Sequence, residues 1–206
     1  EEQHQCRRAV FLDHGVDYDL FDAAADEPWV PEELKGTARP IVGYFGDIDA
    51  HTVDLELVQR VAALLPRFTF VFVGTSTVAT NGLAGRQNVK LISRRPYEQV
   101  PHYGKCFDVA IMPWQQNEWI KACNPIKLKE YLALGKPVVS TPFTELCHFG
   151  EVVYQALGAQ EFAVAIEQAL RENCVERVRA RKERVRPYTW DSRAELALRV
   201  VSEARR

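Results

Sequence analysis

The chain has 206 residues, with a hydrophobic fraction of 47% and a charged fraction of 26%, which are ordinary values for one globular domain with short appendages. Its formal net charge of -2 gives no sign of a nucleic-acid partner, and no apolar run approaches the roughly 20 residues that cross a bilayer. The five cysteines are scattered and form no C-x-x-C pair, so we expect a reducing, cytoplasmic setting without a structural zinc site.

The first 37 residues are expected to be a leader that precedes the main domain. Residues 9–12 form a short apolar run that predicts a strand, and residues 13–17 carry the glycine and aspartates typical of a turn. Three prolines and a glycine predict a linker over residues 23–40.

Continuous apolar runs that alternate with helical segments predict a parallel sheet. Continuous runs, rather than alternating ones, are typical of strands buried on both faces. The predicted strands are residues 41–45, 68–73, 89–92, 108–112 and 138–140, with residues 152–154 as a sixth candidate. Helices are predicted near residues 52–65, 97–105, 125–134, 160–173, 175–186 and 191–205. This alternation indicates a doubly wound, Rossmann-like α/β sheet.

Two of these helices have features that invite specific expectations. Thr52 is expected to cap the first helix, whose buried stripe is predicted to hold Leu57, Val58, Val61, Leu64 and Leu65. The basic stretch 177–186 indicates a solvated helix face, with phosphate or membrane contact as the alternative.

The helix near residues 125–134 is unusually well delimited. Asn124 is expected to be its N-cap and Pro125 its first residue, whereas Gly135 and Pro137 are expected to end it. Ligands of an open parallel sheet bind beyond the carboxyl ends of the strands, where this helix begins. Its free N–H groups and its dipole therefore favour an anion at that edge.

Lys127 and Glu130 are expected on the same face of this helix. Lys127 adds a positive charge within the first turn, and Glu130 lies nearly one turn deeper. A phosphate at the helix mouth would leave Glu130 near two vicinal hydroxyls, which a carboxylate can hold in a ribose. The alternative is a surface ion pair worth about 0.2–0.5 kcal/mol.

The string NPIKLKEYLALGKPVVST, residues 124–141, closely resembles the donor-binding signature of retaining glycosyltransferases of the GT-B fold, in the group often called family 4 or group 1. Other segments are similar to that family in order and spacing, namely residues 14–17 at the crossover between lobes, 41–47, 70–75, 94–100 and 107–113. The resemblance covers nearly the whole chain and implies the C-terminal, donor-binding lobe of a two-lobed enzyme.

The resemblance also implies a division of the chain. Residues 1–37 would be a crossover or linker remnant of the N-terminal lobe, and residues 38–188 the nucleotide-sugar-binding domain. Residues 189–206 would form a C-terminal helix that packs back toward the N-terminal lobe. The acceptor site and the catalytic residues are expected in that other lobe, so the chain alone is expected to be inactive.

Site roles follow from the same resemblance, position by position. Glu130 would hold the donor ribose. The diphosphate would be bound by Asn124, Pro125, Ile126, Lys127, Gly46 and Asp47. The nucleoside pocket would be lined by Gly74, Thr75, Arg95, Pro96, Tyr97, Met112 and Pro113. The resemblance implies no cofactor or metal, because such enzymes usually need no metal and the sequence shows no carboxylate pair or histidine cluster with ligand spacing. The nucleoside-diphosphate sugar would be the substrate.

Two departures from the family pattern concern the diphosphate. Ala122 stands where the family often has a second carboxylate. The turn after the first strand carries Asp47 and Asp49, whereas many members have arginine and lysine there. Cationic groups are therefore expected from Lys127, from the arginines at 94 and 95, or from the other lobe.

The implied function is transfer of a hexose from a nucleoside-diphosphate sugar to a glycan or lipid-linked acceptor, with retention and with possible peripheral membrane association of the larger protein. Two alternatives remain open at this point. One is a lobe of a nucleotide-sugar 2-epimerase, and the other is a non-catalytic, flavodoxin-like binding domain. A Rossmann dehydrogenase is disfavoured because no G-x-G-x-x-G follows a strand.

Overall fold

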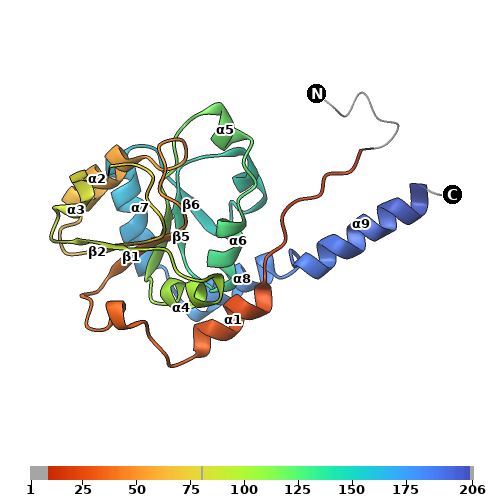
Figure 1. Ribbon diagram of the computed structural model, residues 1–206, viewed down its shortest axis with the longest axis horizontal. Coiled ribbons are helices and arrows are strands. Elements are labelled where there is room, and N and C mark those ends of the chain that lie inside the picture. Colours follow the sequence, from red (N-terminus) through yellow and green to blue (C-terminus); the bar gives the residue numbers. More distant parts are fainter. Residues whose placement is uncertain (1–8, 80, 205–206) are drawn as a thin grey trace.

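The computed structural model describes residues 9–79 and 81–204, which are built around a sheet of parallel strands in the order β3-β2-β1-β4-β5-β6 (Figure 1). The strands are β1 (Ile41–Phe45), β2 (Thr69–Val73), β3 (Val89–Ile92), β4 (Val109–Met112), β5 (Val138–Ser140) and β6 (Val153–Gln155). Each predicted strand from residue 41 onward is present within one residue of its expected bounds. The predicted doubly wound α/β class is confirmed.

Helices cover both faces of the sheet (Figure 1). One layer contains α2 (Leu55–Leu64), α3 (Asn81–Ala84) and α7 (Ala159–Arg171), and the other contains α1 (Tyr18–Asp26), α4 (Val100–Gly104), α6 (Ile126–Ala133) and α8 (Val175–Val185). Successive strand side chains alternate between the layers: Val42 and Tyr44 of β1 join one hydrophobic cluster, and Ile41 and Phe45 join the other. Both faces are therefore buried, which explains the continuous apolar runs.

Helix α1 was not predicted from the sequence, which placed its residues in the leader. The side chain of Asp17 caps it by accepting a hydrogen bond from the backbone N–H of Leu20 at 3.3 Å. Phe21 and Ala24 are buried against the core, and the helix packs on α4 and α6. The predicted linker also contains a 3-10 turn, η2 (Glu32–Leu34).

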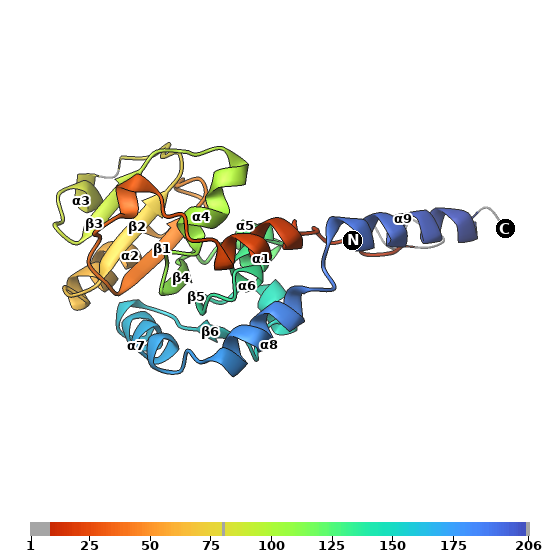
Figure 2. The ribbon, with the colours of Figure 1, turned by 90° about the horizontal axis from the view of Figure 1, so that it is seen from below.

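The predicted strand at residues 9–12 is wrong, because these residues adopt irregular structure. Their apolar side chains are exposed, Phe11 by 69%, and no strand of the described residues lies beside them. Further along, Val16 makes a parallel bridge to Thr189, just before α9 (Trp190–Ala204). The leader thus joins the start of α9, which extends away from the sheet (Figures 1 and 2).

A buried ion pair fixes this junction. Asp13 lies 3.1 Å from the ammonium group of Lys129 on α6 and 2.9 Å from Nε of Arg193 on α9. The Lys129 side chain is almost fully buried and also donates to the carbonyl oxygen of His14 at 2.8 Å. Burial lowers the pKa of Lys129, and the Asp13 carboxylate opposes that shift.

Two expectations for α2 were wrong. Its N-cap is Asp54, which accepts from the backbone N–H of Leu57 at 2.9 Å, and not Thr52. Leu64 is exposed, whereas the other predicted members of the buried stripe are buried. An aspartate directly before the first turn reaches its N–H groups, which Thr52 stands too far back to do.

The basic stretch of α8 is largely paired within the domain. Arg181 is buried and donates to the carbonyl oxygen of Gly135 at 3.0 Å, just after the end of α6. Lys182 lies 2.6 Å from the carboxylate of Asp22 on α1. Gly135 itself has a φ of +71°, as expected of a glycine that terminates a helix.

Candidate functional site

The candidate site lies where the strand order changes direction, between β1 and its neighbour β4. The two strands lead at their carboxyl ends into the turn at Gly46 and into the segment that enters α6. A cavity of about 460 Å³ opens there. It is lined by Phe45, Gly46, Asp47, Asp49, Thr52, Val73, Gly74, Arg94, Arg95, Tyr97, Val100, Ile126, Lys127 and Glu130.

Glycines at 46 and 74 allow the cavity wall to form. Gly46 has a φ of +126°, and a Cβ atom there would lie 2.5 Å from Nζ of Lys127. A Cβ atom at Gly74 would lie 2.1 Å from the carbonyl oxygen of Gly46. The turn after β1 therefore packs directly on the end of β2 and leaves room for the lysine above it.

Glu130 is a buried carboxylate at the inner end of this cavity. Glu130 is only 5% exposed, and the hydroxyl group of Tyr97 donates to its Oε1 at 3.0 Å. Burial raises the pKa of Glu130 to about 7, while the Tyr97 hydrogen bond and the charge of Lys127 act to lower it. A buried, poorly satisfied acceptor suits a ligand that brings hydroxyl donors.

Lys127 lies in the first turn of α6 and does not pair with Glu130. Its ammonium group donates to the hydroxyl oxygen of Tyr44 at 2.6 Å and lies 4.0 Å from the centre of that ring. Within the described part of the chain, Lys127 has no carboxylate at ion-pair distance. The alternative of a surface pair between Lys127 and Glu130 is therefore wrong.

The expected cap of α6 is also wrong. Pro125 occupies the N-cap position, and no side chain caps the helix. Asn124 instead accepts a hydrogen bond from the ammonium group of Lys129 at 3.0 Å. Neither Asn124 nor Pro125 lines the cavity, whereas Ile126 and Lys127 do. The buried lysine takes the side-chain oxygen that a helix cap would have used.

The two arginines after β3 differ in their availability. Arg95 lines the cavity, but its Nε donates to the Tyr103 hydroxyl at 2.9 Å and its guanidinium pairs with Glu33. That contact lowers the pKa of Glu33 to about 2. Arg94 is exposed at the cavity, and among the described residues its side chain has no hydrogen-bond or ion-pair partner. Arg94 is thus the more available cation of the two.

Four residues predicted for the nucleoside pocket do not line this cavity. Met112 is fully buried in the core, and Pro113 is buried with its carbonyl oxygen accepting from the N–H of Asp54 at 2.8 Å. Thr75 and Pro96 are exposed outside the lining. The cavity does bring together eight other predicted site residues, namely Gly46, Asp47, Gly74, Arg95, Tyr97, Ile126, Lys127 and Glu130.

Several lining residues were not predicted. The apolar wall includes Phe45, Val73 and Val100, and the turn after β1 adds Thr52. Phe45 and Val73 each end a strand and immediately precede a glycine that was predicted for the site. Their position at the strand ends could therefore have indicated that they line the cavity. The side chain of Asp49 accepts from the backbone N–H groups of residues 51 and 52, both at 2.9 Å, and holds that turn.

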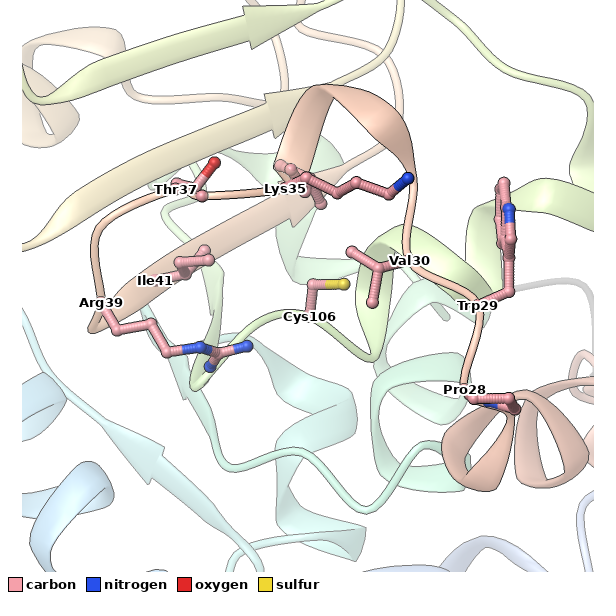
Figure 3. A pocket seen from close by; sticks show the side chains of 10 residues that line it. Pro28, Trp29, Val30, Lys35, Thr37, Arg39, Ile41 and Cys106 are labelled. Carbon is pink, nitrogen blue, oxygen red and sulfur yellow. The ribbon is translucent and has the colours of Figure 1, made fainter.

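Another cavity, of about 590 Å³, lies at the amino end of β1 and contains none of the predicted site residues (Figure 3). Figure 3 shows Cys106, Val30 and Ile41 between Arg39 and Trp29. Its cations are already neutralised, because Arg39 pairs with Asp108, and Lys35 lies 2.6 Å from Glu32. Because this cavity lies at the amino end of β1, opposite the end where α6 begins, it is not the candidate site.

Within the described ranges, no group of three or more histidine, cysteine, aspartate or glutamate side chains is placed to hold a metal ion. None of the helices described is both long and apolar enough to cross a membrane. The four cysteines in the described part of the chain, at positions 106, 123, 147 and 174, are free.

Comparisons with known proteins point to one family. Residues 39–172 match the family model described as glycosyl transferases group 1. The chain is 32% identical over 172 residues to TuaH of Bacillus subtilis (strain 168), whose name assigns it to teichuronic acid biosynthesis as a glycosyltransferase. That match covers 79% of this chain and 42% of the relative.

Solved structures show the same fold at low sequence identity. The sucrose-phosphate synthase of Thermosynechococcus elongatus aligns with a TM-score of 0.78 and 18% identity, over 97% of this chain and 53% of that one. A glycosyltransferase of Rickettsia africae ESF-5 aligns with a TM-score of 0.75 and 16% identity, over 94% and 56% of the two chains. The chain thus spans about half the length of the proteins it matches.

Proposed function

Since this chain belongs to the glycosyl transferases group 1 family, we propose that it is the donor-binding lobe of a GT-B enzyme that transfers a hexose from a nucleoside-diphosphate sugar, with retention. The acceptor is a glycan or lipid-linked sugar, which the name of the Bacillus relative supports. In this proposal the acceptor site and the catalytic residues lie in an N-terminal lobe. The location is cytoplasmic, with peripheral membrane contact of the larger protein.

One observation carries the proposal: Glu130 and Lys127 line one cavity at the carboxyl edge of the sheet, at different depths. Glu130 is buried and accepts one hydrogen bond from Tyr97, so its remaining lone pairs are available to the two hydroxyl groups of a ribose. Lys127 lies at the mouth of α6 beside the Gly46 turn, where a diphosphate would meet a positive charge and the helix N-terminus.

The same arrangement supports a role in the chemical step. Negative charge develops on the departing diphosphate when the bond to the sugar breaks. Positive groups that are already in place stabilise that charge more than they stabilise the intact donor. Lys127 and Arg94 are the cations at this cavity that have no carboxylate partner among the described residues. They supply the positive charge that the acidic turn after β1 lacks.

Calorimetric titration with UDP, GDP and ADP, and with the matching nucleosides, tests the proposal. Glu130→Ala should weaken nucleotides and nucleosides alike, by about 1.5–3 kcal/mol, because its partner is the ribose. Lys127→Ala should weaken the diphosphates and leave the nucleosides nearly unchanged. Lys121→Ala is the matched control, because Lys121 is an exposed lysine in a surface pair with Glu118 outside the cavity.

Equal losses for diphosphate and nucleoside in the Lys127 variant would contradict a diphosphate at the helix mouth. Unchanged affinity in the Glu130 variant, with the fold intact, would contradict the ribose site. Either result would leave the family membership standing and would move the donor site elsewhere on the lobe.

A further inference from the structure

Tyr44 is a buried tyrosine of β1 whose role the donor site does not by itself explain. Its side chain is fully buried, and its ring packs at 5.8 Å from the ring of Phe72. Only its hydroxyl group reaches the carboxyl edge of the sheet, where it contacts Lys127 and the turn after β1. Tyr44 does not line the cavity.

The hydroxyl group makes two directional hydrogen bonds. It donates to the carbonyl oxygen of Asp47 at 2.9 Å, so its oxygen lone pairs are free to accept. It accepts from the ammonium group of Lys127 at 2.6 Å. The lysine is thereby tied to the backbone of the turn through one phenol, although the two residues are 83 positions apart in the chain.

This tie holds the ammonium group directly above the turn. A Cβ atom at Gly46 would lie 2.5 Å from Nζ and 2.6 Å from Cε of Lys127, so the end of the lysine occupies the space beside that glycine. The Tyr44 hydroxyl uses one of the three ammonium protons, and no other acceptor for Lys127 is found among the described residues. The remaining protons are available to an anion.

From this geometry we propose that Tyr44 is a positioning residue, which orders the Lys127 ammonium group over the Gly46 turn to receive the donor diphosphate. The inference rests on the proposed function. A flexible lysine side chain loses rotamer freedom when it binds an anion, and a lysine that is already ordered loses less. Tyr44 thus orders the lysine beside a turn that carries Asp47 and Asp49 and contains no lysine or arginine of its own.

Tyr44→Phe tests the inference, because it keeps the buried ring and removes only the oxygen. We expect UDP to bind about five- to tenfold more weakly, the size of one lost hydrogen bond, and uridine to bind within about twofold of the unaltered chain. In the Lys127→Ala background, Tyr44→Phe should have no further effect on UDP, since the group it orders is gone. GDP with guanosine, or ADP with adenosine, replaces the uridine pair if it binds more tightly.

Tyr131→Phe is the matched control. Tyr131 is also fully buried, and its hydroxyl accepts from the backbone N–H of Phe45 at 2.9 Å without touching Lys127. Its loss should not separate UDP from uridine. Equal weakening of UDP and uridine by Tyr44→Phe, or the same effect with and without Lys127, would overturn the positioning role.

The two proposals fail differently. If Lys127→Ala weakens UDP selectively but Tyr44→Phe does not, the diphosphate site stands and the positioning role is wrong. If Lys127→Ala has no selective effect, both the site and the positioning role are wrong.

Discussion

Replacing Glu130 by glutamine should change how the stability of this chain depends on pH. Glu130 is 5% exposed, and burial raises its pKa to about 7 from an ordinary value of 4.5. The folded chain therefore holds this proton more tightly than the unfolded chain does. Because the folded pKa lies above the unfolded one, the stability that the Glu130 proton contributes is fully present below about pH 4.5 and is lost as pH rises toward 7. Glutamine carries no such proton.

The magnitude follows from the two pKa values. Each pKa unit corresponds to about 1.4 kcal/mol. When the pKa of a carboxyl group rises from 4.5 to about 7 on folding, only part of the total free-energy change falls between pH 5 and pH 8, and that part destabilises the folded state by about 2.5 kcal/mol. Glu130→Gln should therefore gain about 2.5 kcal/mol over the unaltered chain across this interval. The comparison between two proteins cancels the other titrating groups.

Urea unfolding of both proteins at pH 5, 6, 7 and 8 measures this difference. Tyr97→Phe serves as a control, because the Tyr97 hydrogen bond lowers the pKa of Glu130 and its loss should move the transition to higher pH. If the difference between the two proteins stays constant within about 0.5 kcal/mol over the whole range, Glu130 is not the buried, proton-holding carboxylate described above.

The same titration should appear in ligand binding. An ionised carboxylate accepts hydrogen bonds from ribose hydroxyls better than a protonated one does. Nucleoside affinity should therefore rise by at least about tenfold from pH 5 to pH 8, and the glutamine variant should show a flat profile. Nucleosides are preferred to nucleotides in this experiment because they carry no phosphate that titrates. A flat profile in the unaltered chain would argue against a ribose at Glu130.

Two further predictions concern stability, and urea unfolding checks both. Asp13→Asn should cost about 3 kcal/mol because it leaves the buried ammonium group of Lys129 without its carboxylate, whereas Asp22→Asn in a more exposed pair should cost about 0–1 kcal/mol. Equal costs would mean that the junction of leader and α9 is not held by this pair. Gly135→Ala should cost more than Gly36→Ala, by about 1–3 kcal/mol. Both glycines have φ near +70°, but only at Gly135 would the new Cβ atom meet another side chain, at 2.7 Å, and similar losses would contradict that packing.

Much of the sheet could be predicted because its signal is local. A parallel strand that is covered on both faces must be apolar at successive positions, and residues 41–45 and 109–112 show this directly. The end of α6 is equally local, since a glycine at φ +71° is the residue that a helix end in this conformation requires. The short apolar run at residues 9–12 carries the same signal and misled the prediction, because a strand also needs a neighbour.

Within the site, the sequence determined which residues stand at the carboxyl ends of strands and at the mouth of α6. Spacing along one helix placed Lys127 and Glu130 one turn apart, and the resemblance to the family attached a ligand to them. The sequence did not predict which side chains Lys127 and Glu130 would contact. Glu130 meets Tyr97, which lies 33 positions away, and Lys127 meets Tyr44.

Tertiary structure alone decided how the charges of α6 are used. Lys129 lies two residues from Lys127 in a string of similar polarity, yet it is buried on Asp13, which is 116 positions away, while Lys127 faces the cavity. Asn124 serves that buried lysine rather than the helix end. The desolvation and ion pairing of a charged side chain depend on which groups the folded chain brings within a few ångströms of it. A local sequence pattern does not show which distant residues those are.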